Sequence, residues 1–229
     1  MAEAAAIASE ADLRRASEDP NFQFVTQLLV KLPLLARAPD FETAMAELGI
    51  GSSALASLPG LLAGLNGAIS RQAFDHGRSS DAGEMAREAL LESLSAQMRD
   101  RLPSLLDPTS QEVRNVLASF SSGQNFAHLA RDFFARLSYR SLEYYLSREL
   151  ANHTGTGKRF ADDADRTAFA RALSQYTFET SRIVLEYAGG WYGKTVWKEQ
   201  TLSQDKINDF SRYAFKKMRS EFGRRRIST

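Results

Sequence analysis

The stretch QNFAHLARDFFARLSYRSLEYYLSRELAN, residues 124–152, decides the fold class. Its apolar side chains recur every three or four positions, which is the spacing of one face of an α-helix. The main stripe contains Phe126, Ala130, Phe133, Leu137, Ser141 and Tyr144, and the side chains that widen it are Phe134, Leu142, Tyr145, Leu146 and Leu150. Because neighbours on several sides are needed to cover so broad a face, we predict that this stretch is the long central helix of a bundle.

Helical spacing continues through nearly all of the remaining chain, and no segment alternates convincingly at a period of two. A second apolar seam, with steps of four and three residues, contains Phe169, Leu173, Tyr176, Thr180, Ile183 and Tyr187. It predicts a helix over about 162–188 that packs against another helix. A last helix is predicted between an N-cap at Ser203 and a stop at Gly223. We therefore expect an all-α bundle of about seven to eight helices without a significant β-sheet.

The length of the chain sets its domain organisation. It has 229 residues, of which 43% are hydrophobic, so it can bury a core without disulfides or a structural metal. Residues 75–83, DHGRSSDAG, are small or polar and predict a linker. We expect a helical extension over 1–77, packed on a main bundle over 78–229 that ends in a basic helix and tail.

Several classes of catalytic site are missing from the sequence. The chain has no cysteine, which excludes thiolate metal sites and cysteine nucleophiles. Its three histidines form no HExxH or ExxH pair, and there is no Gly-x-Ser-x-Gly elbow. We therefore expect no metal and no cofactor. The first residues, MAEAAAIASEADLRR, lack the basic region and apolar run of a secretory signal, so a cytoplasmic location is expected.

Residues 48–70, LGIGSSALASLPGLLAGLNGAIS, carry no charged side chain and are long enough to span a bilayer. Gly60, Gly64 and Ala68 have the small-residue spacing that lets two helices approach closely. We expect a buried helix in tight contact with its neighbours. A membrane-active segment is the alternative, although so many glycine, serine and alanine residues give weak hydropathy.

The segment EYAGGWYGKTVWKEQ, residues 186–200, contains the Gly-Lys-Thr triplet of a phosphate-binding loop. Such a loop has a further glycine five residues before Gly193, and that position is Ala188. We predict instead that a helix ends at Gly189 or Gly190. The aromatic loop expected to follow has as its contact residues Trp191, Tyr192, Lys194, Trp197 and Lys198. Rings interleaved with lysines can stack on bases and neutralise phosphates, or anchor a protein partner.

Positive charge is concentrated at the end of the chain. Residues 194–229 contain ten Lys or Arg and four Asp or Glu, a balance of +6, whereas the preceding residues carry −5. On the predicted last helix, Arg212, Lys216 and Arg219 fall opposite the apolar stripe. The other predicted contact residues are Lys217, Arg224, Arg225 and Arg226. This surface fits nucleic-acid phosphates, bound without base specificity, or an acidic protein partner.

The segment RELANH, Arg148 to His153, places an arginine and a histidine at the end of the long helix. Their spacing resembles the Arg-x4-His signature of HEPN-family ribonucleases. The resemblance implies an all-helical, often dimeric domain in which Arg148 and His153 cleave RNA without metal, His as general acid or base and Arg stabilising phosphorane charge. It covers six residues, and Glu149 departs from the neutral or shorter polar residue that the family prefers. Arg71 and His76 have the same spacing.

The function expected from these features is that of a non-enzymatic subunit of a larger assembly. Its basic C-terminal helix and aromatic loop would contact the RNA or DNA backbone or other protein subunits, and a homo-oligomer is compatible with the same surfaces. A HEPN-like ribonuclease using Arg148 and His153 is the alternative. A membrane-active protein using residues 48–70 is a lesser one.

Overall fold

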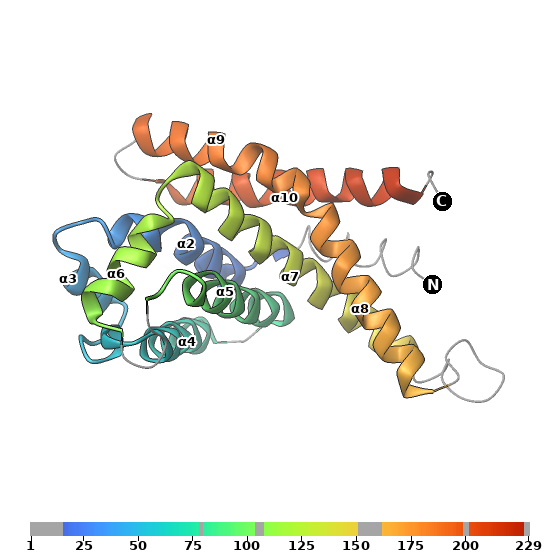
Figure 1. The fold of residues 1–229 in the computed structure, drawn as a ribbon, viewed down its shortest axis with the longest axis horizontal. Coiled ribbons are helices and arrows are strands. Elements are labelled where there is room, and N and C mark those ends of the chain that lie inside the picture. Colours follow the sequence, from blue (N-terminus) through green and yellow to red (C-terminus); the bar gives the residue numbers. More distant parts are fainter. Residues whose placement is uncertain (1–15, 78–79, 104–107, 151–161, 199–201, 227–229) are drawn as a thin grey trace.

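The computed structural model describes residues 16–77, 80–103, 108–150, 162–198 and 202–226, with side chains except at 145–150, 198 and 223–226. All regular structure in these residues is helical, which confirms the predicted all-α bundle (Figure 1). The elements in chain order are α2 (Pro20–Leu35), α3 (Phe41–Glu47), the 3-10 helix η1 (Ala54–Ala56), α4 (Leu58–Asp75), α5 (Asp81–Arg99), α6 (Ser110–Ser119), α7 (Gly123–Leu150), α8 (Asp163–Thr180), α9 (Arg182–Lys198) and α10 (Gln204–Arg226).

Helix α7 is the centre of the bundle, as its broad apolar face predicts. It packs against α5, α8 and α9 (Figure 1). Phe126, Phe133 and Phe134 are completely buried in these contacts. The helix begins after Ser122, whose hydroxyl accepts a hydrogen bond from the backbone N–H of Asn125 at 3.2 Å.

The uncharged segment 48–70 forms η1 and most of α4. The apolar face of α4 is buried through Leu61, Leu65 and Ile69. A Cβ atom on Gly64 would lie 2.7 Å from Cγ2 of Ile50, so a larger side chain would not fit at this contact. The predicted tight contact of this segment with its neighbours is therefore confirmed, but the neighbour at Gly64 is the chain before η1 and not a second α-helix. Within the described residues, no helix combines the length and the apolar character needed to cross a bilayer.

The N-terminal helices pack directly on the later ones. Helix α2 contacts α5, α6 and α10, and α4 contacts α5. One hydrophobic cluster includes Phe22 of α2, Leu90 of α5 and Met218 of α10. The division of the chain at residue 77 stays a prediction.

The helix predicted over 162–188 is interrupted at Ser181, where α8 ends and α9 begins. Three hydroxyls near this point donate to backbone carbonyls of the preceding turn: Thr177 to Ser174 at 2.9 Å, Thr180 to Tyr176 at 2.8 Å and Ser181 to Phe178 at 2.7 Å. Such bonds compete with the regular ladder and bend helices. The chain therefore changes direction at Ser181, although the backbone of this residue keeps right-handed helical angles (φ −67°, ψ −8°).

The prediction that a helix ends at Gly189 or Gly190 is wrong, because α9 continues through both glycines to Lys198. The reason for glycine at position 189 is space. A Cβ atom there would lie 2.7 Å from the carbonyl oxygen of Gly123, and a Cβ on Gly123 would lie 2.8 Å from that of Gly189. The two residues let the backbones of α7 and α9 touch. The predicted stop at Gly223 is wrong too, since α10 reaches Arg226.

Candidate nucleic-acid interface

Helix α10 is attached to the bundle by a group of aromatic side chains. Phe210, only 2% exposed, lies at its centre. Its ring stacks on Trp191 with a centroid distance of 4.2 Å and contacts Phe126, Phe134 and Tyr187 at 5.8, 5.9 and 5.8 Å. These contacts fix the rotation of α10 about its axis, and therefore fix which of its side chains face solvent.

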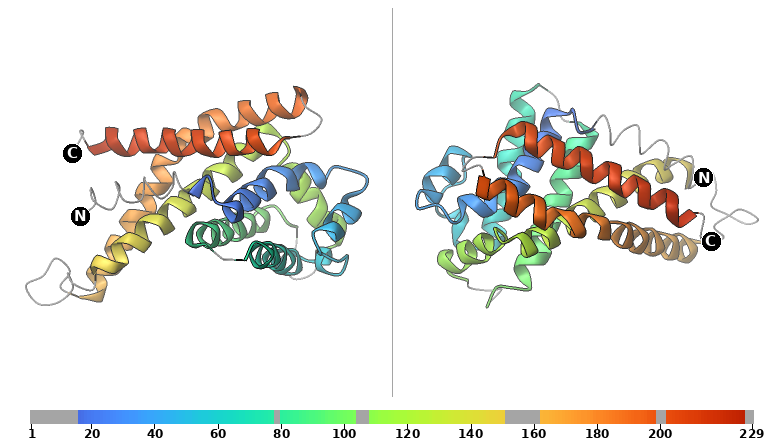
Figure 2. Two further views of the ribbon diagram at one scale, coloured as in Figure 1. Left: turned by 180° about the vertical axis from the view of Figure 1, so that it is seen from behind. Right: turned by 90° about the horizontal axis from the view of Figure 1, so that it is seen from above.

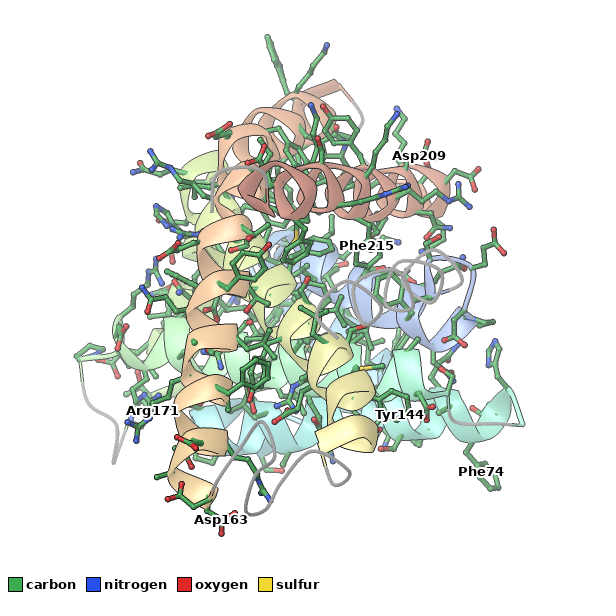
Figure 3. All side chains as sticks on the ribbon, turned by 90° about the vertical axis from the view of Figure 1, so that its right-hand side faces the viewer. Phe74, Tyr144, Asp163, Arg171, Asp209 and Phe215 are labelled. Atoms are coloured by element: carbon green, nitrogen blue, oxygen red, sulfur yellow. The ribbon has the colours of Figure 1, made fainter. Side chains whose placement is uncertain are left out.

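The face of α10 opposite this group is exposed and cationic in its C-terminal half. Arg212, Lys216 and Arg219 are all exposed, as the sequence predicts. Figure 3 shows the two sides of the helix, with Phe215 directed into the protein and Asp209 at the outer edge. Arg212 is 3.4 Å from the carboxylate of Asp209, a surface ion pair that contributes little to stability.

Two further residues complete the exposed surface. Tyr213 is partly exposed, and the ammonium group of Lys217 lies 5.3 Å from the centre of its ring. Lys217 is half-buried, so it is less accessible to a ligand than Lys216. The side chains of the predicted contact residues Arg224, Arg225 and Arg226 lie outside the described residues, although their backbone belongs to α10.

The charges of α10 change sign along the helix. Asp205 and Asp209 are exposed in its N-terminal half, where Lys206 is the single cation, and the exposed cations Arg212, Lys216 and Arg219 follow in the C-terminal half. This order complements the helix macrodipole, which is positive at the N-terminus and negative at the C-terminus. The exposed cations are concentrated in the C-terminal half, where Arg212 to Arg219 span about 10 Å of helix.

The predicted aromatic loop does not exist, because its residues belong to α9. Tyr192 is buried, stacks on Phe126 at 3.9 Å and donates a hydrogen bond to the carbonyl of Val30 at 3.2 Å. Burial raises its pKa well above the usual value of a tyrosine. Trp191 is half-buried against Phe210. The rings of both residues pack on the hydrophobic core, and the glycines of α9 concealed its apolar spacing in the sequence.

Trp197 and Lys194 are exposed, Trp197 to 83% of its surface. Helices α9 and α10 run antiparallel side by side, so the end of α9 lies beside the beginning of α10 (Figures 1 and 2). Because Trp191 stacks on Phe210, Trp197 lies about 12 Å along the helix axis from the level of Arg212 and about 22 Å from that of Arg219. Lys194, one turn after Trp191, lies nearer to Arg212 than Trp197 does, and the contact of these two residues with the same ligand stays a prediction. The side chain of Lys198 lies outside the described residues.

Two arginines of α7, in contrast to the exposed cations of α10, are neutralised within the protein. Arg136 of α7 is 2.8 Å from Asp132 and 3.0 Å from Glu92 of α5. Arg140 forms ion pairs with Glu88 and Glu92. These arginines connect α5 to α7 and are not available to a ligand. In contrast, Lys216 forms no ion pair with any described residue.

The proposed ribonuclease pair stays a prediction, because the side chain of Arg148 and the whole of His153 lie outside the described residues. Arg71 and His76, which have the same spacing, each contact a backbone carbonyl of the protein. Arg71 donates to the carbonyls of Leu48 and Gly49 at 2.8 and 3.2 Å, where α3 ends. His76 follows α4, with Nδ1 3.1 Å from the carbonyl of Gln72. No three His, Asp or Glu side chains within the described residues are grouped to hold a metal.

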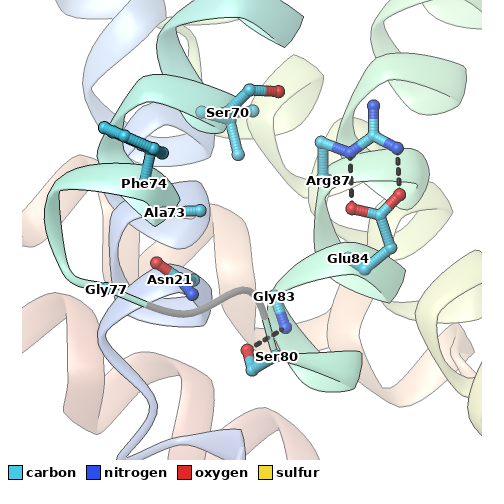
Figure 4. A pocket seen from close by; sticks show the side chains of 10 residues that line it. Asn21, Ser70, Ala73, Phe74, Gly77, Ser80, Gly83, Glu84 and Arg87 are labelled. Atoms are coloured by element: carbon cyan, nitrogen blue, oxygen red, sulfur yellow. Dashed lines mark hydrogen bonds and ion pairs between the residues drawn. The ribbon is translucent and has the colours of Figure 1, made fainter.

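A pocket that the sequence did not indicate lies between α2, α4 and α5 (Figure 4). Its volume is about 400 Å³, and its walls include Ile69, Ala73 and Asn21. The charged groups in it neutralise each other, since Arg87 binds Glu84 through two nitrogen atoms. The pocket brings together residues from three helices, and no spacing along the chain reveals such a group.

Comparison with known proteins identified no relative of this chain. The chain matches no protein-family model, no curated protein and no solved structure.

Proposed function

We propose that this chain is a non-enzymatic helical subunit of a larger assembly and that it contacts nucleic-acid phosphates through the C-terminal half of α10. The observation that carries the proposal is the exposure of Arg212, Lys216 and Arg219 on one side of a helix whose other side is fixed in the core through Phe210. Rigid attachment keeps the three cations in a row, so binding a polyanion requires little ordering of the protein.

Binding of this kind would be independent of base sequence. Lysine and arginine contacts to phosphates release condensed counterions, and this release supplies most of the free energy of non-specific binding. Tyr213, exposed beside the row of cations, offers a ring on which an unpaired base could stack. This ring favours nucleic acid over an acidic protein surface, the other partner compatible with the cations.

The test is a triple substitution, Arg212→Gln, Lys216→Gln and Arg219→Gln. We expect roughly 10- to 100-fold weaker binding of fluorescent single-stranded RNA and duplex DNA, measured by anisotropy at low salt, because three phosphate contacts are lost. The control is Arg99→Gln, Arg166→Gln and Arg171→Gln, which removes the same charge at exposed positions of α5 and α8. Equal losses in both variants would contradict the proposal. Binding of an acidic protein but of neither nucleic acid would assign the surface to the other partner.

A further inference from the structure

We propose that Arg131 of α7 and Arg182 of α9 form a second, separate anion site that binds a phosphate group at the junction of α8 and α9. Figures 1 and 2 show α7 running beside this junction. The site does not depend on α10, and its ligand is either a free phosphate-bearing molecule or a phosphate of the nucleic-acid backbone.

Arg131 is held in place by α8. Its guanidinium lies over the ring of Phe178, 4.0 Å from the centroid. One of its terminal nitrogens donates to the carbonyl oxygen of Phe178 at 3.2 Å. Stacking and hydrogen bonding together fix the plane of the guanidinium, which is what bidentate recognition of phosphate requires.

The charge of Arg131 is not neutralised by the described residues. Its Nε atom is shielded from solvent and has no hydrogen-bond partner among them. The adjacent carboxylate of Asp132 binds Arg136 at 2.8 Å. Burial, followed by the charge of Arg182, lowers the pKa of Arg131, and Asp132 opposes this only in part. A bound anion would remove both the desolvation cost and the repulsion between the two arginines.

Arg182 supplies the exposed half of the site. It is the first residue of α9, one turn after Phe178, and it forms no ion pair with any described residue. Of the nearby carboxylates, Glu179 accepts a hydrogen bond from Gln175 at 3.0 Å, and Glu186 is exposed one turn further along α9. Phe178 remains 45% exposed, so a ligand can reach the guanidinium edge beside its ring.

The test is a titration of the full-length, nitrogen-15-labelled protein with inorganic phosphate at constant ionic strength, followed by NMR. We expect saturable shifts of amides near Arg131 and near Ser181. Arg182→Gln should weaken binding at least roughly tenfold, since it removes one of two cations. Arg131→Lys keeps the positive charge but removes the planar guanidinium, and with it bidentate hydrogen bonding and stacking on Phe178. Its affinity for phosphate should fall by a similar factor. Arg171→Gln, an exposed arginine earlier on α8, should bind phosphate as the wild type does.

The same titration distinguishes phosphate binding at Arg131 and Arg182 from nucleic-acid binding by α10. The triple variant of α10 should keep the phosphate shifts, and an oligonucleotide added to that variant identifies the source of the phosphate. If the oligonucleotide shifts the same amides, the backbone occupies the site; if only inorganic phosphate does so, the ligand is a small molecule. Absence of saturable shifts in the wild type, or unchanged affinity in Arg182→Gln, would overturn the proposal.

Discussion

Replacing Gly189 with alanine is expected to destabilise the protein by about 3 kcal/mol, because two helix backbones meet at this residue. The added Cβ atom would lie 2.7 Å from the carbonyl oxygen and 3.1 Å from the carbonyl carbon of Gly123. Backbone atoms cannot move aside by changing rotamer, so α7 and α9 would have to separate. Separation would disturb the stacked pair Phe126 and Tyr192. Denaturant unfolding followed by circular dichroism measures the change.

Gly190 is the matched control, because it is the next residue of the same helix. A Cβ atom there meets nothing within 4 Å. Gly190→Ala should therefore stabilise the protein by about 0.5–1 kcal/mol, the usual gain when alanine replaces glycine in a helix. If the glycines ended a helix, as the sequence suggested, at least one would have a positive φ and alanine would be strained there. Destabilisation by Gly190→Ala, or a neutral effect of Gly189→Ala, would contradict the contact between the two backbones.

Phe210→Ala is expected to cost about 3–5 kcal/mol, the largest effect of a single substitution on α10. The ring contacts Trp191, Phe126, Phe134 and Tyr187, so its removal leaves a cavity between α10, α9 and α7. The cavity cannot close without moving other large rings. The same denaturant titration measures the loss.

Phe74→Ala provides the comparison for Phe210→Ala. This phenylalanine is 84% exposed at the end of α4, so its removal should change the free energy of unfolding by less than about 0.5 kcal/mol. A loss below about 1 kcal/mol for Phe210→Ala would mean that α10 is not fixed by its aromatic face. The rigid row of cations would then lose its structural basis.

The sequence predicts best those helices whose conformation and buried face follow from the apolar spacing within the helix itself. The stripe through Phe126, Phe133 and Leu137 specifies both the conformation of α7 and its burial. The stripe through Ile207, Phe210, Ala214 and Met218 does the same for α10. Because the buried face is known, the exposed face is known too, and Arg212, Lys216 and Arg219 were placed correctly for that reason.

The failures arise where a partner helix determines the conformation. Glycine is a frequent helix terminator, and only the position of Gly123, far away in sequence, explains why Gly189 lies inside α9. The break at Ser181 depends on hydroxyl groups that are individually compatible with a helix. The same applies to the anion site, since Arg131 and Arg182 come together only through the packing of α7 on α9.

The salt dependence of nucleic-acid binding tests the proposed function most directly. For the wild-type protein, the logarithm of the association constant should fall linearly with the logarithm of the salt concentration. In the variant with Arg212→Gln, Lys216→Gln and Arg219→Gln, the slope should be smaller by about 2 to 3, because each lost phosphate contact removes about 0.7 to 0.9. An unchanged slope in this variant would contradict the assignment of the nucleic-acid interface to α10.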